Sequence, residues 1–217
     1  MKNIKVFGLL ALMIAAVLFV PVSAVTQSAS AVQIGGSDSV NVAANVNVGG
    51  HGVNQIAQST QINTRNSVAG AVNANLGGYH VEQVAVANQK NTYASVDVAG
   101  NVNLGGKGVY QGAQADQSFA VKSINGAVNA NLGGKGIGQT SIASQTFAWE
   151  SINGAVNANL GGHRVGQYAV ADQFATHESI NVAGNLDVFG SHDTQKVSAS
   201  QWFANEDVNA GLNINFF

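Results

Sequence analysis

Polar and apolar positions alternate along most of this chain, and the pattern returns every 28 residues. In Val53–Gln61 the odd positions carry Val, Gln, Ala, Ser and Gln, and equivalent positions of the other units change little. The even positions between them vary freely, from Ile56 to Gly112 and Lys196 at one phase. A period of two with one constrained face is typical of a half-buried β-strand.

A second alternating segment, Ser67–Leu76, follows in the same unit. One face carries Val68, Val72, Ala74 and Leu76, and the other carries Ala71, Asn73 and Asn75. Both faces keep their residue types from unit to unit, so we predict a strand that is contacted on both sides.

The segments between these strands differ in character. A variable arc rich in aromatic residues follows the first strand, and Gly-Gly follows the second at 49–50, 77–78, 105–106, 133–134 and 161–162. Paired glycines supply the positive φ that a tight reversal needs. The repeating unit is therefore predicted as strand, arc, strand and Gly turn.

Two columns of amide side chains keep this period without insertion or deletion. Gln recurs at Gln27, Gln55, Gln83, Gln111, Gln139, Gln167 and Gln195. Asn recurs at Asn45, Asn73, Asn101, Asn129, Asn157, Asn185 and Asn213. In an antiparallel meander these residues would lie two strands apart. In stacked β-arches each lies about 4.8 Å above its counterpart, where amides form hydrogen-bonded ladders.

The pattern therefore predicts an all-β fold of stacked β-arches, a β-solenoid-like stack of two sheets built from seven repeats. Residues 25–217 form one repeat domain. Residues 1–24 are predicted to be a signal peptide, with Lys2 and Lys5, an apolar stretch and the small residues before position 25. Cleavage would leave no membrane span and a net charge of −4, with seven basic and eleven acidic residues.

No motif for catalysis, a cofactor or a metal emerges. The chain lacks a Gly-x-Ser-x-Gly elbow, a P-loop and His-Glu-x-x-His, and the five His are scattered. No basic stripe suggests a nucleic acid. We therefore predict that the protein is not an enzyme and has no cofactor.

Charged residues form two short columns. Glu150, Glu178 and Glu206 share one arc position, and Lys107 and Lys135 share one position beside the Gly turn. In an arch these columns lie at opposite rims. They are either solvated edges or contacts between neighbouring rings of an assembly.

The tandem Gln-x5-Gln and Asn-x-Asn units resemble bacterial curli subunits, although the curli repeat is shorter. They are more similar in kind to the amyloid-like sheath protein of filamentous archaea such as Methanospirillum. That resemblance covers Val25 to Phe217. It implies an archaeal host and an exported subunit that joins copies of itself into hoops stacked around the cell.

The chain begins and ends in strands of the repeat without a helix or charged cap. Head-to-tail pairing of such edges generates rings or filaments. We predict a secreted structural subunit that polymerises edge to edge into an extracellular sheath or fibre, with itself, neighbouring rings or other envelope components as partners. The alternatives are an outer-membrane β-barrel and a monomeric secreted β-solenoid adhesin or binding protein.

Overall fold

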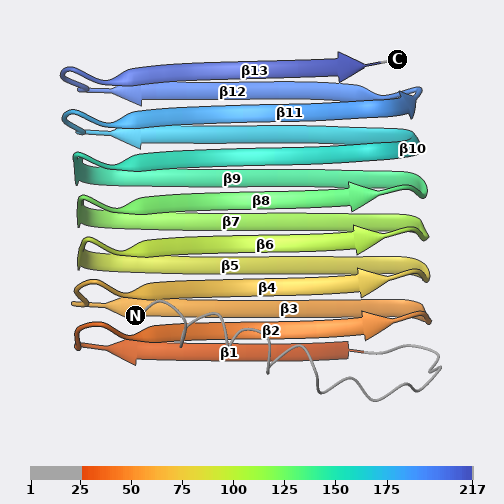
Figure 1. The fold of residues 1–217 in the computed structure, drawn as a ribbon, viewed down its shortest axis with the longest axis horizontal. Helices are drawn as coiled ribbons and strands as arrows, with labels where there is room; N and C mark the ends of the chain where they lie inside the picture. The colour runs from red at the N-terminus through yellow and green to blue at the C-terminus, as the bar shows by residue number, and fades with distance from the viewer. Residues whose placement is uncertain (1–25, 217) are drawn as a thin grey trace, which may run out of the picture.

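A computed structural model describes residues 26–216, which form strands joined by short turns (Figure 1). The predicted signal peptide lies outside the described residues. The strands are β1 (Thr26–Ile34), β2 (Val40–Val48), β3 (His51–Ile62), β4 (Val68–Leu76), β5 (Tyr79–Tyr93), β6 (Val96–Leu104), β7 (Lys107–Val121), β8 (Ile124–Leu132), β9 (Lys135–Trp149), β10 (Ile152–Phe174), β11 (Ile180–Ser191), β12 (Thr194–Trp202) and β13 (Val208–Phe216).

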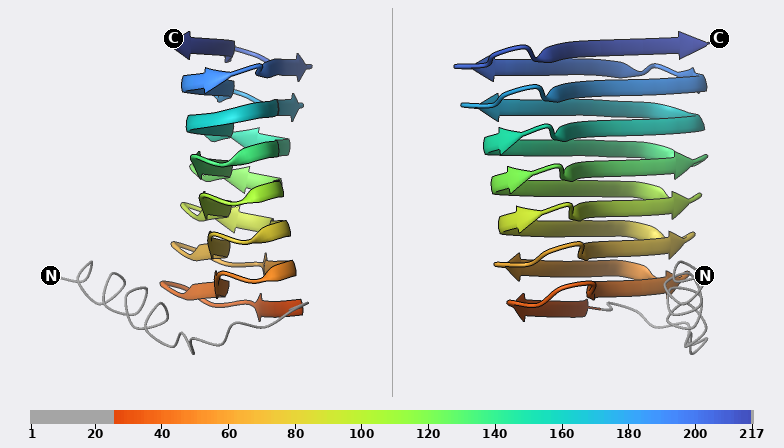
Figure 2. Two further views of the ribbon diagram at one scale, coloured as in Figure 1. Left: turned by 90° about the vertical axis from the view of Figure 1, so that its right-hand side faces the viewer. Right: turned by 60° about the vertical axis from the view of Figure 1, so that its left-hand side comes forward.

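The strands form two parallel stacks that face each other (Figure 2). The first stack contains β1, β3, β5, β7, β9, the second part of β10 and β12. The second contains β2, β4, β6, β8, the first part of β10, β11 and β13. Every pair is parallel with a shift of 28 residues, as in Gln55↔Gln83 and Asn73↔Asn101. One rung is thus one repeat, with rung 1 formed by β1 and β2 and rung 4 by β7 and β8.

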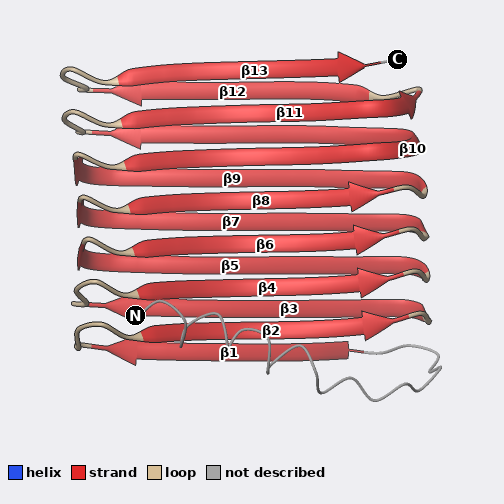
Figure 3. Cartoon of the chain, in the orientation of Figure 1, coloured by secondary structure: helices blue, strands red, loops and turns tan. Residues whose placement is uncertain are grey.

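The chain reverses at the two ends of each rung (Figure 3). At the Gly turn, Gly77 and Gly78 have φ of 73° and 120°. A Cβ on Gly78 would lie 3.0 Å from the carbonyl oxygen of Gly50, so the stacked turns also require the missing side chain. The arcs instead use non-glycine residues in the left-handed region, such as Phe119 at 55° and Glu150 at 47°. The arc shape therefore costs about 1–2 kcal/mol per such residue, which the stack must offset.

The interior between the sheets is narrow and half polar. Columns of Ala from both sheets, such as Ala57 and Ala71, are fully buried and pack together. A column of Val53, Val81, Val109, Ile137 and Val165 closes the Gly-turn end. Gln and Asn columns fill the rest of the interior and are also buried. Small Ala side chains let the sheets approach, so amides of one sheet reach the backbone of the other.

The predicted fold class is confirmed, including the two-sheet stack and the 28-residue register. The alternation of β3 is also confirmed, because Val53, Gln55, Ala57, Ser59 and Gln61 are all buried. The prediction that the second strand is contacted on both sides is wrong for the single subunit. Its Asn face is buried, but Leu76 on the other face is 44% exposed, since no described part of the chain forms a third layer.

Candidate functional site

The first candidate site is the Gln ladder along the first sheet. Gln83 Nε2 donates to Gln55 Oε1 at 2.9 Å, and Gln111 Nε2 donates to Gln83 Oε1 at 3.1 Å. The same bond joins each Gln to the rung before it, from Gln55 through to Gln195. Each Nε2 also donates across the interior, as from Gln111 to the Ala130 carbonyl at 3.3 Å. The column therefore ties rung to rung and sheet to sheet.

The Asn ladder on the second sheet runs in the opposite sense. Asn73 Nδ2 donates to Asn101 Oδ1 at 2.9 Å, toward the later rung, and also to the Val84 carbonyl at 2.7 Å. This bond recurs from Asn45 to Asn213. Sequence spacing indicated both columns but not their directions.

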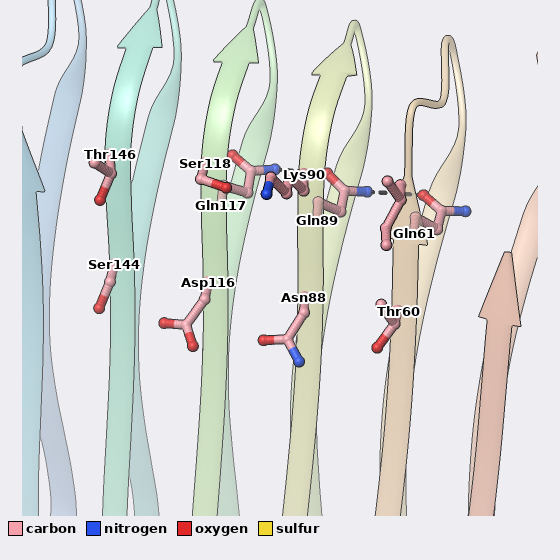
Figure 4. A pocket seen from close by; sticks show the side chains of 11 residues that line it. Thr60, Gln61, Asn88, Gln89, Lys90, Asp116, Gln117, Ser118, Ser144 and Thr146 are labelled. Atoms are coloured by element: carbon pink, nitrogen blue, oxygen red, sulfur yellow. Dashed lines mark hydrogen bonds between the residues drawn. The ribbon is translucent and has the colours of Figure 1, made fainter. Parts of the chain in front are cut away.

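Two further columns reinforce these ladders. A second Gln column, which includes Gln61, Gln89 and Gln117, donates in the same direction as the first. Figure 4 shows these three side chains in line, joined by dashed bonds, beside a separate row of outward polar side chains that includes Asn88. A second Asn column, with Asn75 and Asn103, donates toward later rungs.

Asp97 interrupts a third Asn column of the second sheet. Its equivalent Asn125 donates to the Ala115 and Ser144 carbonyls and to Asn153 Oδ1. Asp97 is fully buried, and neither of its carboxyl oxygens, nor Asn125 Oδ1 above it, has a partner among the described residues. Burial, and then the charge of Asp116, raise the pKa of Asp97 well above its usual range.

We expect Asp97→Asn to raise the free energy of unfolding at pH 7 by about 1–3 kcal/mol, because an amide supplies the missing donors. The native pKa of Asp97 is raised, so the stability from its protonated form is complete below the unfolded pKa and is lost as pH rises through the native pKa. The gain should therefore shrink toward pH 4. Denaturant unfolding at both pH values measures it.

Asp97→Ala is the matched control, since Ala69 occupies the same column one rung earlier. It removes the buried charge without adding donors, so it separates the two contributions. An Asn variant that is no more stable than the Ala variant at pH 7 would show that the ladder bonds at this position contribute nothing.

A second pair of buried carboxylates lies at the last Gly turn. Asp187 replaces Asn in its column and accepts from Asn159, and Asp193 accepts from the Val165 backbone N–H at 2.7 Å. Burial and a hydrogen bond with Asp187 raise the pKa of Asp193 to about 6. Protonation is complete below the unfolded pKa and is lost through about pH 6, so this turn is held best in acid.

The charged columns lie in register but are less uniform than the sequence indicated. Lys107 pairs with Lys135 beside the Gly turns, and Glu150 and Glu178 occupy successive arcs with Glu206 in the next. The arc column also contains Lys122, whose Nζ lies 3.3 Å from Glu150 Oε2. Both side chains are about half exposed, so the pair contributes little stability.

Sequence reasoning missed two contacts between His rings of adjacent rungs. The ring centroids of His51 and His80 lie 5.3 Å apart, and those of His163 and His192 lie 5.0 Å apart. Their spacing of 29 residues is one rung and one residue, so a search at the 28-residue phase does not find them. Within residues 26–216 no group of three or more His, Cys, Asp or Glu could hold a metal ion.

Comparison with models of protein families, with curated proteins and with solved structures finds no match. In the described part of the chain, no helix is long and apolar enough to cross a membrane. The functional argument therefore depends on the ladders and the sheet edges.

Proposed function

We propose that this chain is a secreted structural subunit that joins copies of itself by β-strand addition into an amyloid-like extracellular sheath or fibre. The observation that carries the proposal is the complementarity of the first and last rungs. It involves both the backbone edges and the ends of the ladders.

The backbone edges repeat the pairing found inside the stack. Gly35 donates its N–H to the Ile62 carbonyl at 2.8 Å, toward rung 2. Because N–H groups of successive strand residues point in opposite directions, those of Ser28, Ser30 and Val32 point away from β3. At the other end, Ala175 donates to the Trp202 carbonyl in the same way, so alternate residues of β12 point their backbone groups outward.

The ladder ends are complementary as well. Gln195 donates to Gln167, so its Oε1 is left as an acceptor at the last rung, while Gln27 Nε2 bonds only the Val46 carbonyl among the described residues. The Asn ladder reverses this, with the Oδ1 of Asn45 free at the first rung and the Nδ2 of Asn213 free at the last. Rung 7 of one subunit can therefore bond to rung 1 of the next as rung 6 bonds to rung 7.

Electron microscopy of the purified protein in negative stain tests the proposal. We expect filaments, hoops or sheets many times longer than one subunit. Fibre diffraction from them should show a meridional reflection near 4.7–4.8 Å. Antibody labelling of intact cells should place the assemblies outside the cell. Single particles that do not grow with time or concentration would overturn the proposal in favour of a monomeric solenoid.

A further inference from the structure

The outward side of the second sheet is an uninterrupted aliphatic surface. We call it the aliphatic face; it consists of the outward residues of β2, β4, β6, β8, the first part of β10, β11 and β13. On β4 these are Val68, Gly70, Val72, Ala74 and Leu76, and every equivalent position on the other rungs is Val, Ile, Leu, Ala or Gly, apart from Phe216.

This face is exposed in the subunit and is far larger than an ordinary surface patch. Val128 is 39% exposed and Leu132 is 45% exposed. Seven strands of nine residues cover about 900 Å² at ordinary strand dimensions, whereas the largest patch on a typical monomer is about 300–600 Å². The outward side of the first sheet differs, because it carries polar residues such as Asn88 and Asp116.

Large and small residues alternate across the aliphatic face. The three central positions read Gly70-Val72-Ala74 on one rung, Val98-Gly100-Val102 on the next, and Gly126-Val128-Ala130 on the third. Each rung keeps a similar total volume, but its large residue changes column. Alternating large and small positions is what lets two layers interdigitate, and a surface that faces water has no use for it.

We propose that the aliphatic face packs against the same face of a second copy, with the sheets about 10 Å apart. Only another sheet with this strand spacing has side chains that mesh over all seven rungs. The area available per partner, about 900 Å², matches the roughly 800 Å² of a stable interface. Face pairing adds a layer, whereas edge addition lengthens the stack, so the two contacts are independent.

A two-fold face contact makes Val128 its centre, since this residue is the middle outward position of rung 4. Gln114 is the matching centre of the opposite outer side, on β7. The chain has no native Cys. In purified full-length protein, mild oxidation should therefore link subunits carrying Val128→Cys and leave those carrying Gln114→Cys unlinked. The reverse result, or no link at Val128→Cys, would overturn the proposal.

Gly154→Val tests the meshing itself. An added Cβ at Gly154 has its nearest neighbour at 4.0 Å, the Val182 carbonyl oxygen, so the subunit accepts it. The change adds apolar area yet fills a hole, so we expect face pairing to weaken at least tenfold. Sedimentation of a variant blocked at its edge by Ser28→Pro and Ser30→Pro measures this as a dimer–monomer equilibrium, with circular dichroism to verify folding.

Three outcomes of that experiment overturn the inference. They are a monomeric edge-blocked parent, tighter pairing by Gly154→Val, and flotation of the monomer with neutral phosphatidylcholine vesicles, which would make a membrane the occupant. If the edge-blocked protein still polymerises, the proposed edge addition fails instead. The cysteine pair then tests face pairing within the polymer.

Discussion

Ser28→Pro together with Ser30→Pro is expected to leave the subunit folded and to stop its polymerisation. Both residues lie on β1 with exposed side chains, and their N–H groups point away from β3. Proline removes these two outward donors and clashes with an incoming strand, while an edge strand tolerates it. We expect elongation to fall by at least a hundredfold in seeded growth followed by electron microscopy, and the variant should cap wild-type ends in mixtures.

Two controls accompany this experiment. Ser28→Ala with Ser30→Ala loses the same hydroxyls but keeps the donors, so it should polymerise normally. Gln114→Pro places proline at the phase of Ser30 within the stack, where it breaks an internal ladder, so it should destabilise the subunit by about 3 kcal/mol or more. If the double proline variant grows as readily as the parent, assembly does not use the first strand as its edge.

Asn129→Leu and Gln111→Leu should each destabilise the subunit by about 2–5 kcal/mol. Asn129 donates to the Thr140 carbonyl at 2.7 Å and to Asn157 Oδ1 at 3.0 Å, and it accepts from Asn101. Leucine leaves these buried groups without a partner, and each such group costs about 1–3 kcal/mol. Chemical denaturation of the variants measures the loss.

Gln114→Leu is the control for these changes. Gln114 is on the same strand as Gln111 but is exposed, and its Nε2 bonds only to the nearby Asp116. Its replacement should change stability by less than about 0.5 kcal/mol. Equal stability of all three variants would show that the buried amide columns contribute nothing beyond filling space.

The repeat determined most of this fold before any coordinates. Identical units at one spacing make parallel, in-register stacking the arrangement that places Gln55 beside Gln83 and Asn73 beside Asn101. Gly77 and Gly78 marked a tight turn because few other residues adopt positive φ without strain. These features are local or repeat-wide, so a single sequence is enough to read them.

Contacts between neighbouring columns were not accessible from the sequence. Lys122 beside Glu150, and His51 beside His80, depend on how the arcs and turns stack rather than on the repeat phase alone. The opposite directions of the Gln and Asn ladders likewise depend on which carbonyls of the facing sheet each amide reaches.

The orientation of the second strand marks the boundary most clearly. By hydrophobicity alone Leu76 and Val72 would face the core, and Asn73 would face water. The structure buries Asn73 and exposes Leu76, because stacked rungs satisfy each amide above, below and across the interior. The sequence by itself determined the repeat, the two strands and the columns of amides. Only the tertiary structure decided which side of the second sheet is the interior, since an amide is stable in a core only when its partners are in place.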